Sequence, residues 1–241
     1  MENIGSWTIK YFEQTSSTND EAKKLVSQIK QKCIVIASKQ NSGRGRRGRI
    51  WISQEGNLFV SFAFEAKLSE IGKLVILSAV TVFNVIKNFA LSQNVKIKWP
   101  NDILVDGKKI SGILFEKADG NFWIMGIGIN VVSSPQNIDG KYETISLKGL
   151  GIDVNVQEVF ENLVLAFDEQ MVVYQQFGFD KIKQMWVDNA FNLGNSVTIR
   201  QEKEDKEGIF CGIGDNGELL LKINEETEKI IVGDLLLKED L

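Results

Sequence analysis

Residues 95–130 read VKIKWPNDILVDGKKISGILFEKADGNFWIMGIGIN, and the turns within them indicate the class of fold. Asp106-Gly107 stands between two apolar runs and is a favoured two-residue turn of a β-hairpin. Residues 110–116 and 122–130 predict a second hairpin across residues 117–121. Because consecutive hairpins pair antiparallel, we predict an α+β (mixed α/β) fold, a mixed or antiparallel sheet with helices on it, rather than a doubly wound parallel sheet.

The sequence on either side of this stretch predicts further strands and helices. Alternation or short buried apolar runs predict strands at residues 7–12, 33–37, 57–64 and 95–98. Helical spacing predicts helices at residues 22–29, 71–91, 156–176 and 180–190, with irregular structure at 131–151. Thr18 and Glu21 have the spacing of a capping box at the start of the first helix.

The character of the chain changes after Asn195. Short apolar runs then alternate with turn residues, and they predict strands at residues 196–200, 208–213, 218–223, 229–232 and 234–237. Five short strands in succession are typical of a small β-barrel module.

Composition excludes several classes of function. The chain has 241 residues and a net charge of −4, so it lacks the basic excess of a protein that coats nucleic acid. It contains no His, which excludes a Ser-His-Asp triad, a His general base and a His-ligated metal. Hydrophobic residues make up 43% and charged residues 25%, which is the profile of a folded globular protein rather than a disordered one.

The cysteines and the apolar segments bear on localisation. Cys33 and Cys211 form neither a metal motif nor a dense disulfide framework, so we expect a reducing, cytoplasmic compartment. Residues 1–7 have neither a basic start nor an apolar core and do not resemble a signal peptide. Polar residues interrupt the longest apolar stretch, residues 74–91, so we expect no membrane span.

Arginine is concentrated in one short segment. The chain has five Arg against 23 Lys, and four of the five are Arg44, Arg46, Arg47 and Arg49. A planar guanidinium matches the paired oxygens of a carboxylate or phosphate, which the ammonium of a Lys does not. Trp51 follows directly, and a cationic loop beside an aromatic ring suits a phosphate together with a stacked base.

The glycines of this loop do not form a known phosphate-binding motif. Residues 43–48 have the spacing Gly-x-Gly-x-x-Gly, but no helical pattern follows them and no Gly-Lys-Ser/Thr ending is present. A solvated charge run or an RGG-like patch is the alternative explanation of the same residues.

Two further segments have both an ordinary and a functional explanation. Lys108 and Lys109 lie beside the predicted hairpin turn, where a lysine is most often a solvated surface residue. Gly126 and Gly128 interrupt a strand, which weakens the strand unless a ligand or another backbone approaches closely. A bend of the kind found in barrels is the alternative explanation of these two glycines.

Together, five segments resemble the biotin–protein ligases, also called biotin–[biotin carboxyl carrier protein] ligases. The segments occur in the family's order and at its spacing, at residues 17–19, 40 with 43–51, 98–102, 109–114 and 126–130. The resemblance covers the whole chain, and it implies a catalytic domain at residues 1–190 and a small SH3-like β-barrel at 191–241. It also implies the reaction, in which ATP activates biotin to biotinyl-5′-AMP and the biotinyl group passes to one Lys of a carrier domain.

The resemblance assigns roles to individual residues. It makes Lys109 the main catalytic charge, between the carboxylate of biotin and the α-phosphate, and it makes Arg44 and Arg46 part of a catalytic lid. The residues expected to contact biotin are Ser17, Thr18, Asn19, Gln40, Arg44, Gly45, Arg46, Lys109, Gly112, Gly126 and Gly128. The residues expected to contact ATP are Arg44, Arg46, Arg47, Arg49, Trp51, Asn101, Asp102, Lys109 and Asn130, with Trp51 stacking on adenine. Mg²⁺ is expected to arrive with ATP, and the resemblance does not assign its protein ligands.

The resemblance also implies partners. The expected acceptor is the biotin carboxyl carrier protein or domain of a biotin-dependent carboxylase, and the family's pairing through the catalytic-domain sheet allows a homodimer. Some family members carry an N-terminal helix-turn-helix and repress transcription, but too few residues precede Ser17 for such a domain, so we expect the short form without specific DNA binding. The chain departs from the family pattern at Asp20 and at Asn41-Ser42, and neither departure is expected to alter the activity.

Two other functions stay open at this point. A lipoate– or octanoate–protein ligase shares the catalytic fold and also uses a Lys, and the acid that drives pyrophosphate exchange would distinguish it. An RNA-binding module that uses the Arg/Gly loop is the alternative from a different class, which the net charge of −4 disfavours. Salt-dependent RNA binding without ATP turnover would identify that module.

Overall fold

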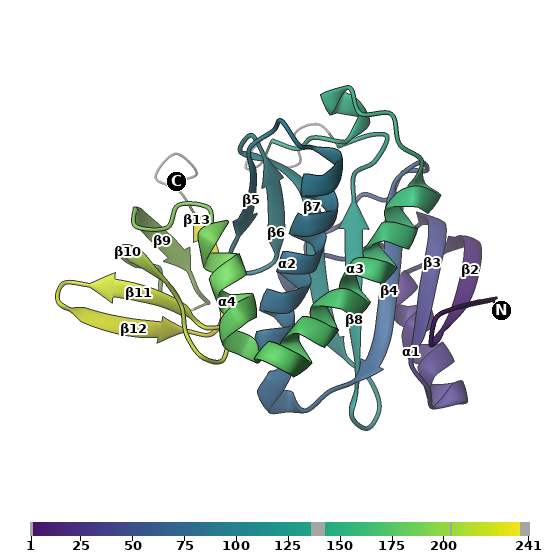
Figure 1. Ribbon diagram of the computed structural model, residues 1–241, viewed down its shortest axis with the longest axis horizontal. Coiled ribbons are helices and arrows are strands. Elements are labelled where there is room, and N and C mark those ends of the chain that lie inside the picture. Colours follow the sequence, from purple (N-terminus) through teal and green to yellow (C-terminus); the bar gives the residue numbers. More distant parts are fainter. Residues whose placement is uncertain (1, 136–142, 203, 237–241) are drawn as a thin grey trace. The chain divides into compact units, whose positions relative to one another are not determined.

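The computed structural model describes residues 2–135, 143–202 and 204–236, which belong to two compact units (Figure 1). The first unit comprises the described residues within Met1–Leu68, Lys109–Ile138 and Glu143–Glu161. The second comprises those within Ser69–Lys108 and Asn162–Leu241. This division differs from the predicted boundary between residues 190 and 191, which stays a prediction.

The first unit is built on a mixed sheet in the order β1-β2-β3-β4-β8-β7. Its strands are β1 (Glu2–Ile4), β2 (Trp7–Thr15), β3 (Cys33–Gln40), β4 (Leu58–Glu65), β7 (Lys108–Lys117) and β8 (Phe122–Ile129). Strands β2 and β3 pair parallel, and the other pairs are antiparallel. The predicted mixed sheet is therefore confirmed, and β1 is a strand that the sequence pattern did not predict.

Helix α1 (Thr18–Ile29) covers one face of this sheet. Ala22, Leu25 and Val26 pack against Cys33 and Val35 of β3 in a buried apolar cluster. Side chains of a strand alternate between the two faces of a sheet, so Ile34 and Ile36 of β3 lie on the opposite face. Burial raises the pKa of the Cys33 thiol to about 12.

The predicted capping box at the start of α1 is wrong. Ser17 is the N-cap residue, and no side chain caps the helix there. Thr18 lies inside the helix, and its hydroxyl donates to Gln40 Oε1 instead, at 3.0 Å. Thr18 is the first helical residue and not the N-cap, so its hydroxyl is not placed to cap the helix and bonds to a residue 22 positions away instead.

Aromatic rings pack on the opposite face of the sheet. Trp7 meets Phe62 edge-to-face with ring centroids 5.3 Å apart, and Tyr11 meets Phe160 at 6.3 Å. Phe160 belongs to α3 (Val156–Phe177), whose first turn is held by a hydrogen bond from the Glu158 amide to Asn155 Oδ1. The sheet is thus packed against apolar side chains on both faces.

The second unit contains the greater part of α3, from Asn162 onward, together with two further helices and two groups of strands. These are α2 (Ile71–Phe89), α4 (Phe179–Asp188), the antiparallel pair β5 (Val95–Lys98) and β6 (Asp102–Val105), and a five-stranded antiparallel sheet. That sheet has the order β12-β11-β10-β9-β13, with β9 (Ser196–Arg200), β10 (Lys206–Ile213), β11 (Leu219–Ile223), β12 (Glu226–Ile230) and β13 (Asp234–Leu236). All five predicted C-terminal strands are present, and residue 237 of the last one lies outside the described residues.

The turn that decided the fold class has the conformation that its residues predict. Asp106 and Gly107 join β6 to β7, and both have positive φ, 49° and 79°. Two consecutive positive φ values define the type I′ turn of a tight hairpin, which Asp-Gly accommodates at low cost.

The long apolar helix α2 of the second unit contains two buried polar side chains, and both are hydrogen-bonded. Within it, Ser78 Oγ and Thr81 Oγ1 donate to the carbonyls of Leu74 and Leu77, so these buried hydroxyls are satisfied. The segment Leu68–Phe89 is long and apolar enough to cross a membrane. The core helix of a soluble protein can have the same length and composition, and 61% of the most apolar part of this segment is buried inside the structure. The absence of a membrane span stays a prediction.

Candidate functional site

Three glycines of β7 and β8 form a patch of bare backbone, here called the glycine patch. Gly112 pairs directly with Gly128, and Gly126 lies two residues earlier on the same face of β8. A Cβ on Gly128 would lie 2.6 Å from Trp51 Cζ2, and a Cβ on Gly126 would lie 3.0 Å from Asn19 Cγ. The side chains of Trp51 and Asn19 therefore approach these strand glycines closely, and the role of the glycines in ligand binding stays a prediction.

A network of neutral polar groups borders the glycine patch at the start of α1. Gln40 Oε1 accepts hydrogen bonds from the amide of Thr18 at 2.8 Å and from its hydroxyl at 3.0 Å. Gln40 Nε2 donates to Ser53 Oγ at 2.9 Å, and Ser61 Oγ donates to Asn19 Oδ1 at 2.6 Å. Thr18, Asn19 and Ser61 are buried, so these groups have fixed orientations. Fixed donors and acceptors beside bare backbone suit the recognition of a small polar ring.

The Arg/Gly loop is folded as a short hairpin. The Trp51 amide donates to the Gly43 carbonyl at 2.9 Å, and the Gly45 amide donates to the Arg49 carbonyl at 2.7 Å. Between these bonds Arg44 and Ile50 form an isolated β-bridge, and residues Arg46–Gly48 form a 3₁₀ turn at the tip. The three glycines of this segment suggest an open flexible loop, but the backbone bonds close its base.

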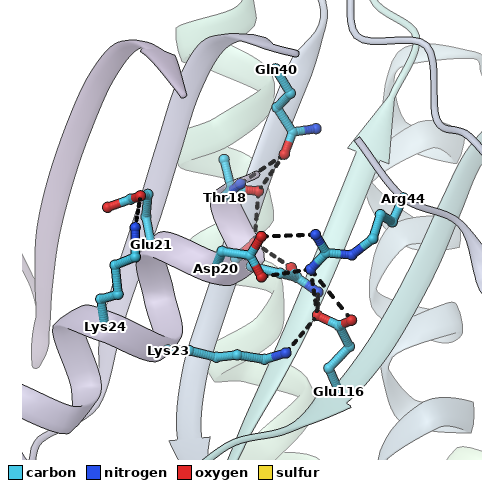
Figure 2. Close-up of polar contacts among 10 residues, drawn as sticks. Thr18, Asp20, Glu21, Lys23, Lys24, Gln40, Arg44 and Glu116 are labelled. Carbon is cyan, nitrogen blue, oxygen red and sulfur yellow. Dashed lines mark hydrogen bonds and ion pairs between the residues drawn. The ribbon is translucent and has the colours of Figure 1, made fainter. Parts of the chain in front are cut away.

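The charged end of the site is an ion-pair cluster at Arg44 (Figure 2). The Arg44 guanidinium donates to both carboxylate oxygens of Asp20, at 2.8 and 2.7 Å, and lies 3.3 Å from Glu116 Oε2. Glu116 also accepts from Asn19 Nδ2 at 2.9 Å and pairs with Lys23 at 3.1 Å. We call Asp20, Arg44 and Glu116 the Arg44 clamp.

The clamp shifts the pKa of each of its members. The hydrogen bond from Arg44 is the main reason that the pKa of Asp20 lies below its usual value. Burial alone would raise the pKa of Glu116, but hydrogen bonds from Asn19 and Lys23 and the charges of Lys23 and Arg44 lower it overall. The bond to Asp20 raises the pKa of Arg44 in turn. All three groups are therefore ionised at neutral pH.

Lys109 and Trp51 occupy the other end of the site. The Lys109 ammonium lies over the Trp51 indole, 5.4 Å from the ring centroid, within the range of a cation–π interaction. The indole itself lies against Gly128 and Gly112. Trp51 therefore covers Gly112 and Gly128 in this structure. Within the described parts of the chain the buried Trp51 Nε1 has no hydrogen-bond partner.

The remaining predicted residues lie outside the glycine patch and the Arg44 clamp. Asn130 is buried, and its Nδ2 donates to the Ile145 carbonyl at 3.1 Å, so it holds the segment after β8. Ser17 is buried at the start of α1, and Arg47 and Arg49 are exposed on the loop. Asn101 and Asp102 belong to the second unit, where Asp102 pairs with Lys98 between β6 and β5.

Several residues of the site were not predicted from the sequence. Ser61 is the one polar residue in the middle of the buried strand β4, and that isolation was a usable signal. Asn57 Oδ1 accepts from the amides of Val131 and Val132, at 2.9 and 3.0 Å, and so shapes the turn after β8. No sequence pattern predicted a role for Glu116, because its partners Arg44 and Asn19 are 72 and 97 positions away in the chain.

Comparison with known proteins identifies a family for both the N-terminal and the C-terminal part of the chain. Residues 11–130 match the Biotin/lipoate A/B protein ligase family, and residues 193–238 match the Biotin protein ligase C terminal domain. The bifunctional ligase/repressor BirA of Bacillus subtilis is 35% identical over 236 residues, which cover 93% of this chain and 72% of that protein. This chain belongs to the biotin protein ligase family.

Other members of the biotin protein ligase family are similar over nearly their full length. The biotin–[acetyl-CoA-carboxylase] ligase of Paracoccus denitrificans is 31% identical over 225 residues, 87% of this chain and 92% of that protein. The biotin protein ligase of Aquifex aeolicus, solved in complex with biotin and ATP, superposes with a TM-score of 0.84 at 26% identity and covers 95% of this chain. The match to residues 11–130 contains every predicted site residue.

Proposed function

We propose that this chain activates biotin with ATP to biotinyl-5′-AMP and transfers the biotinyl group to one lysine of a biotin carboxyl carrier domain. The observation that carries the proposal is the glycine patch bordered by the Gln40 and Asn19 hydrogen bonds, inside the segment that matches the family. Relatives named as biotin ligases, and a structural relative that binds biotin and ATP, support it.

In the first step, a carboxylate oxygen of biotin forms a bond to the α-phosphorus of ATP, and pyrophosphate leaves. Both reactants are anionic, so the barrier depends on positioning and on nearby positive charge. Lys109 is the proposed cation at the reacting carboxylate. The Gln40 network, with its fixed donors and acceptors, is the proposed holder of the ring of biotin.

In the second step, the neutral amine of the acceptor lysine attacks the acyl carbon of the adenylate. An amide bond forms, AMP leaves and one proton is released. This step needs no covalent enzyme intermediate, which suits a chain that contains no His.

Mg²⁺ is proposed to enter with ATP. Among the residues that the structure describes, no group of three His, Cys, Asp or Glu side chains could hold a metal ion. Mg²⁺ usually keeps several waters and binds through substrate phosphates with one or two carboxylates, so its use here does not require a protein cage. A cytoplasmic location, where carrier proteins and ATP are available, is part of the same proposal.

The decisive experiment combines the protein with biotin, ATP, Mg²⁺ and a biotin carboxyl carrier domain. We expect the mass of the carrier to increase by one biotinyl group. The controls omit ATP, or use a carrier whose target lysine is replaced by Arg. Octanoic or lipoic acid in place of biotin tests the related ligases, because modification by either acid in preference to biotin would contradict the proposal.

A further inference from the structure

The Arg44 clamp joins three elements that are distant in sequence. Asp20 lies in the first turn of α1, Arg44 in the loop, and Glu116 near the end of β7. Figure 2 shows the guanidinium between the two carboxylates, with Lys23 reaching Glu116 from the helix side. Contacts to both a helix and a strand fix the loop in two directions.

The geometry at Asp20 is that of a strong ion pair. Two parallel hydrogen bonds at 2.7 and 2.8 Å form the bidentate arrangement that a guanidinium makes with a carboxylate. The side chains of Arg44 and Asp20 are each 36% exposed, so they are neither deeply buried nor freely solvated. Bidentate pairs of this kind define a side-chain position even where solvent weakens their net energy.

The clamp also compensates the charge of Arg44 within the protein. Asp20 and Glu116 supply two negative charges, and Arg44 and Lys23 supply two positive charges. A guanidinium held in this way is a poor direct ligand for a phosphate, because it would have to leave both carboxylates first. The resemblance had assigned Arg44 to direct contact with the anionic substrates.

The clamp connects to the glycine patch through one side chain. Glu116 Oε2 accepts from Asn19 Nδ2, and Asn19 Oδ1 accepts from Ser61 while it lies against Gly126. The position of the loop and the shape of the patch therefore depend on a common carboxylate.

We propose that Asp20 and Glu116 are positioning residues that hold Arg44, and through it the Arg/Gly loop, so that the site retains biotinyl adenylate until the acceptor arrives. The proposal rests on the proposed function. Ordering a free loop costs conformational entropy, and contacts that hold Arg44 offset part of that cost. Asp20, which departs from the family pattern, thereby gains a role that its sequence position did not suggest.

The test is a double-mutant cycle of Asp20→Asn and Arg44→Gln. Each single variant breaks the bidentate pair, and loss of a charged hydrogen bond predicts about a tenfold faster release of biotinyl adenylate. Because both substitutions remove the same interaction, the double variant should release the adenylate no faster than the worse single variant. Multiplying effects would overturn the proposal, as would unchanged release in both single variants.

Further variants separate positioning from a loss of folding. Glu116→Gln should also accelerate release, whereas Glu21→Gln should leave it unchanged, because Glu21 lies in the same helical turn and pairs with Lys24 instead. Asp20→Glu, which keeps the charge, should restore part of the retention. A merely structural role would lower all rates together with the fraction of folded protein, and equal effects of Glu21→Gln and Asp20→Asn would contradict the proposal.

A second readout works without substrates. Trypsin cleavage after Arg46, Arg47 or Arg49 in the ligand-free protein reports opening of the loop, and we expect Asp20→Asn and Glu116→Gln to accelerate it while Glu21→Gln does not. If the unmodified protein makes no biotinyl adenylate, the proposed function fails, yet this cleavage still tests the clamp. Equal cleavage rates in all variants would show that the clamp does not hold the loop.

Discussion

The two ends of the candidate site hold their cations in different ways. At the loop end, Arg44 lies between the carboxylates of Asp20 and Glu116. At the strand end, Lys109 lies over the neutral ring of Trp51, beside the bare backbone of Gly112. Two cations in one site can therefore have different surroundings: two carboxylates accept hydrogen bonds from Arg44, whereas Lys109 lies over an aromatic ring.

The largest effect is expected at the strand end. Lys109→Ala removes the cation proposed at the reacting carboxylate, which should slow adenylate formation by about 10²–10³, as for loss of one well-placed electrostatic group. Lys108→Ala is the matched control, one residue away on the same strand, and should keep the normal rate. Pyrophosphate exchange driven by biotin measures both variants, and equal rates would remove Lys109 from the chemistry.

The glycine patch provides the next test. Gly128→Ala would place a methyl group 2.6 Å from Trp51 Cζ2, so the indole must shift, and overpacking of this kind costs about 1–3 kcal/mol. We expect weaker biotin binding, measured by calorimetry. Gly107→Ala is the control, because that position has open space but positive φ. It should lower the free energy of unfolding by about 1 kcal/mol without changing biotin affinity. Equal biotin affinity in both variants would contradict the proposed role of the patch.

Trp51 tests whether the ring that covers the patch also binds the nucleotide. Indole stacking on a base is worth about 1–3 kcal/mol, so Trp51→Ala should raise the KM for ATP by about tenfold. The KM for biotin should change less. Steady-state kinetics with each substrate varied in turn decide the point, and an unchanged KM for ATP would place adenine elsewhere.

The smallest effect concerns the pH dependence of the clamp. The pKa values of Asp20 and Glu116 lie below those of free carboxyls, so the stabilisation is complete only above about pH 5 and is lost as the pH falls through the lowered values. The difference in Tm between the unmodified protein and Asp20→Asn should therefore shrink between about pH 7 and pH 3. Thermal unfolding followed by circular dichroism measures it, and a difference that grows on acidification would have the wrong sign.

Local signals in the sequence predicted most of the fold. Asp106-Gly107 gave the hairpin because its turn needs positive φ at two adjacent positions, which few other residue pairs accept. Alternation and helical spacing located the strands and helices, with ends that differ by a few residues, as for α2, which ends at Phe89 rather than residue 91. These features depend on residues that are close together in the chain, so the sequence alone is enough to predict them.

Local sequence patterns could not predict contacts between residues that are distant in the chain. Thr18 is not the cap of its helix because α1 begins one residue earlier than the predicted capping box requires, and its hydroxyl bonds to Gln40. Glu116 is one acidic residue among many in the sequence, and only the pairing of β7 with β8 and the approach of α1 bring it to Asn19 and Arg44. Gly126 and Gly128 are unusual residues for a strand, but only the fold shows that Asn19 and Trp51 lie against them.

The burial of Cys33 under α1 has a practical consequence for chemistry on this protein. Alkylating reagents react with the thiolate, and a pKa of about 12 leaves almost none at neutral pH. The exposed Cys211 of β10 is the other cysteine, so the folded protein accepts a single maleimide without any engineering. A second label per molecule then reports exposure of Cys33, by separation of α1 from the sheet or by unfolding of the whole chain, and mass spectrometry can follow it without a spectroscopic probe.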